Sequence, residues 1–90
     1  MIRKECLETA NTITASDRQN DYGTPENNFQ AIAELWSAYK RVDFTATDVA
    51  VLLALLKIAR IKTSPHKEDN WVDLAGYAAC GCEVSTCNKA

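Results

Sequence analysis

The stretch V-A-V-L-L-A-L-L-K-I-A-R-I at residues 49–61 decides the fold class, because it is apolar almost all the way around a helix. Thr45 and Asp48 precede it with capping-box spacing, and Pro65 follows it. A helix with this composition is typical of the central element of a bundle or of an oligomer.

Helical spacing also recurs on both sides of this stretch. A first helix is predicted over about residues 2–16, with a frayed Thr-rich end, and residues 17–23 are predicted to be a loop. Thr24 as N-cap and Pro25 as first helical residue open a second helix. Asp69 or Asn70 is predicted to cap the fourth.

No segment alternates apolar and polar residues long enough to predict a strand. We therefore expect an all-α fold, a single-domain bundle of about four helices that forms an oligomer. Residues 1–83 are expected to form the domain and residues 84–90 a loose tail. Gly76 lies inside the fourth helix, where glycine costs about 1 kcal/mol against alanine, so we expect another helix or a ligand to approach it closely.

Composition limits the classes of function. The 90 residues are 47% hydrophobic and carry a net charge of −2, which argues against non-specific nucleic-acid binding. No signal peptide is recognisable, and the longest apolar run is too short to span a bilayer. A soluble, cytoplasmic protein is expected.

The cysteines favour free thiols. In a cytoplasmic chain disulfides are the weaker interpretation, and the C-G-C-x4-C arrangement of Cys80, Cys82 and Cys87 lacks the usual spacing and a nearby fourth ligand for zinc. The sequence leaves open whether these three thiols are free, paired or metal-bound.

Five charged or aromatic side chains form the first candidate site: Lys57, Arg60, Asp69, Asp73 and Tyr77. The last three are spaced four apart on one helical face. Antiparallel pairing would place this row against the two cations. The carboxylates could then share one magnesium ion and the cations could hold phosphate. The alternative is structural, with one cation pairing with Asp73 between the helices.

The segment D-Y-G-T-P-E-N-N at residues 21–28 is the second candidate site. Tyr22 offers a stacking face, Asn27 and Asn28 offer amides that can contact a base or ribose, and the following helix N-terminus suits an anion. The alternative is a turn and a helix cap. Patterns for nucleophilic catalysis, phosphate-binding loops and dinucleotide folds are absent.

The motifs D-Y-G-T-P-E-N-N-F, D-V-A-V-L-L-A-L-L-K-I-A-R-I and D-N-W-V-D-L-A-G-Y-A-A occur in this order between about residues 18 and 83. The chain resembles a family of small, uncharacterised phage and prophage all-α domains. It is more distantly similar to phage domains associated with nucleotide modification and to the all-α nucleoside triphosphate pyrophosphohydrolases of the MazG and dimeric dUTPase type.

The second resemblance implies a four-helix core, assembly as dimers or tetramers, and magnesium held by E-E-x-x-E and E-x-x-D motifs. This sequence departs from that pattern. Residues 48–61 contain no glutamate, and Asn70-x-x-Asp73 replaces one carboxylate with an amide. Fewer acidic ligands would weaken magnesium binding and the activation of water.

The predicted function is therefore a phage-type nucleotide-binding protein that acts without turnover, such as a sponge for a nucleotide signal of host immunity. Lys57 and Arg60 would hold phosphate, and Tyr22, Asn27, Asn28 and Tyr77 would contact the rest of the ligand. One alternative is a degenerate magnesium-dependent pyrophosphohydrolase with Asp69 and Asp73 as metal ligands, so the cofactor is either magnesium or none.

A second alternative is an inhibitor that binds a host defence protein. In each case we expect a homo-oligomer in the cytoplasm (that of the host cell, if a phage encodes the chain), with neither membrane nor nucleic acid as partner.

Overall fold

The computed structural model describes the backbone of residues 1–87 and the side chains of residues 1–16 and 20–86. Its helices form four rods, and residues 1–87 contain no strand. The first rod combines α1 (Arg3–Thr12), a π-helical segment η1 (Ile13–Asp17) and α2 (Arg18–Tyr22); the others are α3 (Pro25–Lys40), α4 (Ala46–Thr63) and α5 (Glu68–Cys87). The all-α prediction with four helices is confirmed.

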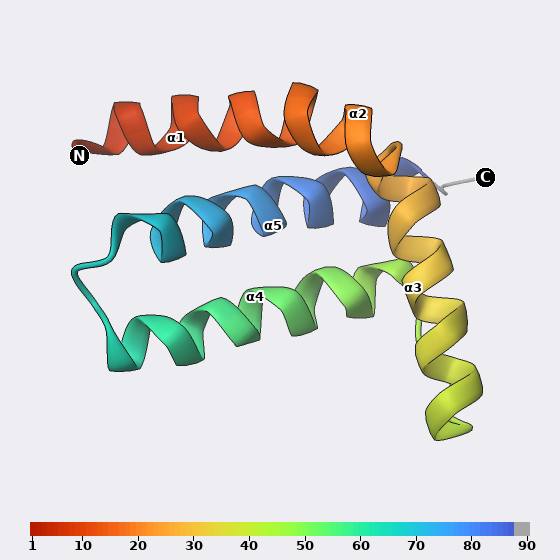
Figure 1. The fold of residues 1–90 in the computed structure, drawn as a ribbon. Coiled ribbons are helices and arrows are strands. Elements are labelled where there is room, and N and C mark those ends of the chain that lie inside the picture. The colour runs from red at the N-terminus through yellow and green to blue at the C-terminus, as the bar shows by residue number, and fades with distance from the viewer. Residues whose placement is uncertain (88–90) are drawn as a thin grey trace.

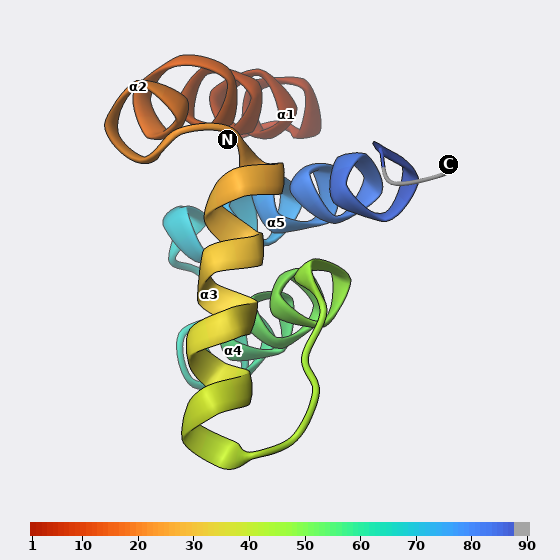
Figure 2. The ribbon, with the colours of Figure 1, turned by 90° about the vertical axis from the view of Figure 1, so that its right-hand side faces the viewer.

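The four rods do not all run alongside one another. Figure 1 shows the first rod, α5 and α4 side by side, with α5 in the middle and antiparallel to α4. Figure 2 shows α3 crossing one end of this row. Because α3 lies across the row, it closes the space between the neighbouring rods at that end, where the cavity described below is found.

The predicted helix starts of α3 and α4 are confirmed. The Thr24 hydroxyl accepts a hydrogen bond from the backbone N–H of Asn27 at 3.4 Å. The Thr45 hydroxyl accepts one from the N–H of Asp48 at 3.1 Å, and the Asp48 carboxylate accepts one from the N–H of Thr45 at 2.9 Å. These bonds satisfy backbone donors that have no partner within the helix.

The prediction of a loop over residues 17–23 is wrong, because the first rod remains helical as far as Tyr22. The hydroxyls of Thr12, Thr14 and Ser16 donate to carbonyls one turn earlier, at 2.7 to 3.1 Å. These residues lie at the passage into the π-helix, so the Thr-rich segment is a wide turn of the helix and not a frayed end. The rod stops at Gly23, whose φ of 84° favours glycine.

Both predicted ends of the last helix also need correction. The helix begins at Glu68, so Asp69 and Asn70 lie in its first turn and do not precede it. The prediction of a loose tail from residue 84 is wrong for residues 84–87, because α5 continues to Cys87 and Val84 is only 3% exposed. Residues 88–90 lie outside the described residues.

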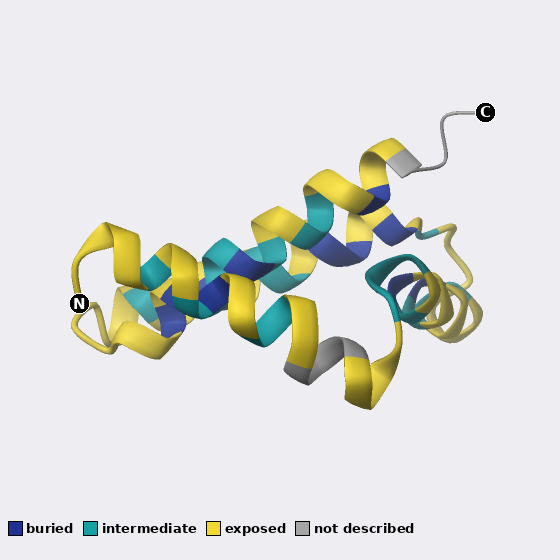
Figure 3. Cartoon of the chain, turned by 90° about the horizontal axis from the view of Figure 1, so that it is seen from above, coloured by how far each residue is buried: buried dark blue, intermediate teal, exposed yellow. Residues whose placement is uncertain are grey.

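The core forms where α3, α4 and α5 meet. Its buried members come from all three helices: Phe29, Ala33, Ala46, Val49, Ala50 and Val84. Trp36 packs edge-on against Phe44, with the ring centroids 6.0 Å apart. Small residues bring α4 and α5 close together, since a Cβ on Gly81 would lie 3.2 Å from the Cβ of Ala50. Figure 3 shows that each helix keeps an exposed face.

The solvent-exposed face of α4, called its outer face below, is apolar. Five large aliphatic side chains of α4 are 40–53% exposed: Val51, Leu52, Leu55, Leu56 and Ile58. The helix therefore buries only part of its apolar circumference within one chain. Among the helices of residues 1–87, none combines the length and the apolar character that crossing a bilayer requires.

Gly76 lies where the first rod packs against α5, and the close approach of another helix that its position inside a helix predicted is confirmed. A Cβ at this position would lie 3.1 Å from Cγ2 of Thr14 in η1. This separation is shorter than ordinary van der Waals contact, so a side chain here requires Thr14 or the first rod to shift by a few tenths of an ångström.

We predict that Gly76→Ala destabilises the fold by about 1 kcal/mol, because overpacking outweighs the gain in helix propensity. Thr14→Ser removes the obstructing methyl group and keeps the hydroxyl. In that background Gly76→Ala should stabilise by up to about 1 kcal/mol. Urea unfolding followed by circular dichroism measures both differences. An equal loss of stability in the two backgrounds would contradict the packing explanation.

Candidate functional site

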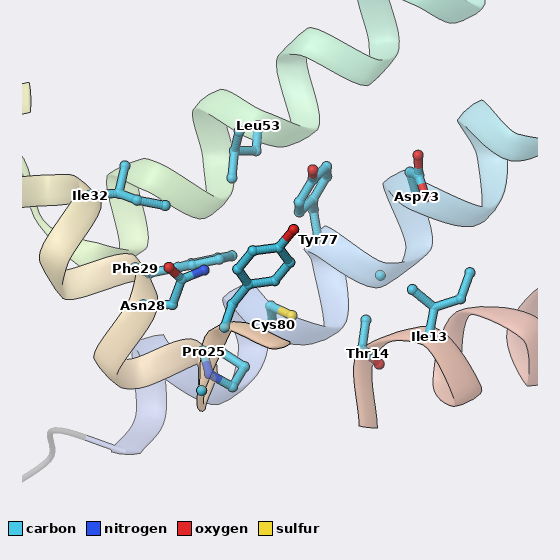
Figure 4. A pocket seen from close by; sticks show the side chains of 13 residues that line it. Ile13, Thr14, Pro25, Asn28, Phe29, Ile32, Leu53, Asp73, Tyr77 and Cys80 are labelled. Carbon is cyan, nitrogen blue, oxygen red and sulfur yellow. The ribbon is translucent and has the colours of Figure 1, made fainter. Parts of the chain in front are cut away.

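A cavity of about 350 Å³ lies between the first rod, α3, α4 and α5 (Figure 4). Its lining is mainly apolar and aromatic, with few polar groups, which is typical of a site for a small organic molecule. The lining residues are Ile13, Thr14, Tyr22, Gly23, Pro25, Asn28, Phe29, Ile32, Leu53, Asp73, Gly76, Tyr77 and Cys80.

The helices position these side chains in different ways. Tyr22 is the last residue of α2, and the turn at Gly23 leads directly to the first turns of α3, which carry Asn28. On α5 the residues that line the cavity recur three or four apart, so they share one face. Figure 4 shows Asn28, Tyr77 and Cys80 around the same space between α3 and α5.

An ion pair borders the cavity. Lys57 Nζ lies 2.8 Å from Oδ2 of Asp73, across the interface of α4 and α5. Lys57 is only 8% exposed, and 24% of the Asp73 side chain is accessible. The structure thus shows the pairing of one cation with Asp73 between the helices that the sequence left as an alternative. The Lys57 ammonium neutralises the one carboxylate in the cavity lining.

The residues predicted from sequence separate into two groups. One group lines the cavity together, although its members come from two separate sequence motifs: Tyr22, Asn28, Asp73 and Tyr77. Lys57, which pairs with Asp73, does not line it. Nor do Arg60, Asn27 and Asp69. Their assignments as ligand-binding or metal-binding residues stay predictions.

Each of these three residues has a separate position. Arg60 lines a different recess at the turn between α4 and α5. Asn27 is exposed, and its backbone N–H serves the cap of α3. Asp69 is exposed on the first turn of α5.

Sequence reasoning missed several lining residues, among them Phe29, Leu53 and Cys80. The spacing Asp73, Tyr77, Cys80 could have indicated Cys80, because it continues the same helical face. Burial is the main cause that raises the pKa of the Cys80 thiol, with smaller contributions from Glu83 and Glu26. Cys80 is therefore a neutral thiol in the cavity wall. Cys80 and Cys82 are both free, but Cys80 is partly buried and Cys82 is exposed.

The donor set for magnesium is incomplete within the described part of the chain. No group of three or more His, Cys, Asp or Glu side chains lies close enough there to hold a metal ion. The carboxylate of Asp73 is engaged by Lys57, and Asp69 is outside the cavity lining. The described residues therefore offer no cluster of acidic side chains around Asp73, and the assignment of Asp69 and Asp73 to magnesium stays a prediction.

We predict that Asp73→Asn destabilises the protein by about 3 kcal/mol, because it leaves the buried ammonium of Lys57 without its counter-charge. Asp69→Asn is the matched control, the same change one helical turn away at an exposed position, and it should cost less than about 0.5 kcal/mol. Urea unfolding measures both. Similar effects of the two variants would show that the ion pair does not contribute to stability.

Comparison with known proteins gives the chain a family but no activity. Residues 5–85 match the model of a family described as "Domain of unknown function (DUF6378)". Two curated relatives are called "Gene 55 protein". The one from Mycobacterium phage L5 is 51% identical over 73 residues, covering 80% of this chain and 47% of the relative.

The other relative, from Mycobacterium phage D29, is 42% identical over 79 residues, covering 88% of this chain and 52% of the relative. The chain thus spans about half the length of these relatives. No solved structure matches it. Because the family model covers nearly all of the four helical rods, the chain belongs to the DUF6378 family, and it is similar to proteins of two mycobacterial phages.

Proposed function

We propose that this domain binds a nucleoside or nucleotide, with the base in the cavity, and that it acts by binding without turnover. One observation carries the proposal: Tyr22, Asn28 and Tyr77, predicted as ligand residues from two separate motifs, line one cavity with Phe29. Aromatic faces and an amide are the groups that stack on a base and hydrogen-bond its edge.

The electrostatics of the cavity favour an uncharged ring over a phosphate. Asp73 is the carboxylate in the lining and is paired with Lys57, and no Lys or Arg side chain lines the cavity. A phosphate group placed there would lose its hydration without gaining a free cation. The base is therefore the part of the ligand that the cavity accommodates, and the phosphates would project outward.

Binding is favoured over hydrolysis for a related reason. A metal-dependent pyrophosphohydrolase needs several carboxylates around its metal ion, and the carboxylate of Asp73 already has a cationic partner. The proposal includes two ligand pools, cellular nucleotides and the nucleotide signals of host defence. A sponge needs only affinity and abundance, both of which a small non-catalytic domain can supply.

We predict that Tyr22→Ala weakens ligand binding about 5- to 150-fold, because a base stacked on an aromatic side chain gains about 1–3 kcal/mol. The measurement is equilibrium dialysis against pooled nucleosides, nucleoside triphosphates and cyclic nucleotides, with quantification of each compound. Tyr39→Ala is the matched control, because Tyr39 is exposed on α3 and does not line the cavity.

The same dialysis separates the alternatives. Conversion of a triphosphate to a monophosphate would show that the domain is an enzyme and would contradict binding without turnover. No depletion of any compound by the unmodified protein would contradict the proposal and favour a protein partner. Equal weakening of binding by Tyr22→Ala and Tyr39→Ala would indicate that the ligand binds outside the cavity.

We further propose that the domain self-associates through the outer face of α4. Val51, Leu55 and Ile58 lie on one side of the helix, with Leu52 and Leu56 beside them, and all five are substantially exposed. Together they exceed the scattered apolar exposure of an ordinary monomer surface. A second copy fits best, since a two-fold contact pairs the same face with itself.

We predict that Leu55→Lys shifts the protein toward the monomer, because it places a charge in the centre of this face. Leu7→Lys makes the same change at an exposed leucine of α1 and should leave the assembly unchanged. Sedimentation velocity over a range of concentrations measures the mass. A monomeric unmodified protein at high concentration would contradict the self-association.

A further inference from the structure

We propose that the recess at the turn between α4 and α5 is a binding site for a phosphate-type oxyanion. The recess has a volume of about 430 Å³ and lies at the end of the helix pair far from α3 (Figure 1). Six residues line it: Ala59, Arg60, Thr63, Ser64, Lys67 and Asn70. Five of the six carry hydrogen-bond donors in their side chains, and none is acidic.

Asn70 is the observation that points to a ligand. The residue is only 6% exposed, yet its side chain makes no hydrogen bond to any described group; only its backbone N–H is paired, with the carbonyl of Lys67 at 3.2 Å. Within the described residues no fully enclosed polar side-chain atom lacks a partner. The amide atoms of Asn70 must therefore reach open space, and the recess is the space that Asn70 lines.

Because its atoms reach the recess, the Asn70 amide is satisfied there either by water or by a bound group. A bound oxyanion would accept a hydrogen bond from the Asn70 NH₂ group. It would also accept hydrogen bonds from the hydroxyls of Thr63 and Ser64, so one small anion could engage several donors of the recess at once.

The charges around the recess favour an anion. Arg60 and Lys67 form no ion pair with any described residue, so both cations are available. Arg60 can hold two oxygens of a phosphate at once. The recess also lies at the N-terminus of α5, a helix of 20 residues whose first N–H groups attract negative charge.

Two carboxylates are nearby in sequence, but neither lines the recess. Glu68 forms an ion pair with the N-terminal ammonium of Met1, and Asp69 is exposed beside it. A purely structural role for Arg60 and Lys67 is to complement the carbonyls at the C-terminus of α4. That role explains the cations but not the unpaired amide of Asn70.

The site does not depend on what fills the aromatic cavity. Arg60 is three residues beyond Lys57 on α4, and Asn70 is three before Asp73 on α5. The recess is thus one helical turn from the buried ion pair on both helices, at the end of the pair away from the core of α3, α4 and α5. A free phosphate and the phosphate of a nucleotide would present the same oxygens to it.

The test is a titration with inorganic phosphate at constant ionic strength, with chloride as the balancing ion, followed by the NMR signal of the Asn70 side-chain amide. We expect a saturable shift. Arg60→Gln should weaken the interaction about tenfold or more. Lys62→Gln removes the same charge two residues away, outside the recess, and should change the affinity less than twofold.

Adenosine and adenosine monophosphate, titrated in the same way, distinguish the sources of the phosphate. A shift with inorganic phosphate and the monophosphate supports a site for any phosphate group, and a shift with the monophosphate alone supports a nucleotide phosphate. A shift that never saturates, equal losses in Arg60→Gln and Lys62→Gln, or a response to adenosine but not to phosphate would overturn the proposal. None of these outcomes depends on whether the aromatic cavity binds a base.

Discussion

The contact between Lys57 and Asp73 is the interaction on which the rest of the structure depends. Removing two charges from water is unfavourable unless they meet with good geometry, and here the ammonium and the carboxylate are 2.8 Å apart. The pair therefore fixes how far α4 can slide or rotate along α5. It also decides the chemistry of the cavity, because it leaves an aromatic space without a free charge.

Two glycines of α5 allow the neighbouring helices to approach it closely. Gly81 lets α5 approach Ala50 of α4, and Gly76 lets η1 approach the opposite side of α5. α3 then crosses the end of the row and brings Asn28 and Phe29 into the cavity wall (Figure 2). Cavity-lining residues from four segments of the chain thus meet because small residues in α5 allow close contact on two of its sides.

Sequence reasoning predicted the elements better than their orientations. The caps at Thr24 and Thr45 are local, so hydrogen bonds within a few residues were sufficient to place them. The rotation of a helix is not local. Lys57 and Arg60 are three residues apart, yet the first pairs with Asp73 and the second lies at the turn. Only the tertiary packing determines which of two neighbouring cations turns inward.

The errors at the ends of helices share one cause. Residues 17–23 and 84–87 are rich in polar and small residues, a composition that is typical of loops. In the structure, hydroxyl groups in or near these segments donate to carbonyls of the preceding turn, as Ser16 and Thr86 do at 2.7 and 2.9 Å. Val84 is held by the core, a long-range contact that composition does not reveal.

The most direct test of the central claim, that the cavity binds the base of a nucleotide, uses two cysteines of the same helix. Cys80 lines the cavity, whereas Cys82 is exposed two residues away. The rate of alkylation of each thiol is measured by peptide mass spectrometry, with and without nucleosides at millimolar concentration. The account predicts that at least one nucleoside slows the alkylation of Cys80 and leaves Cys82 unchanged. Unchanged rates at Cys80 with every nucleoside, or equal slowing at both thiols, would contradict it.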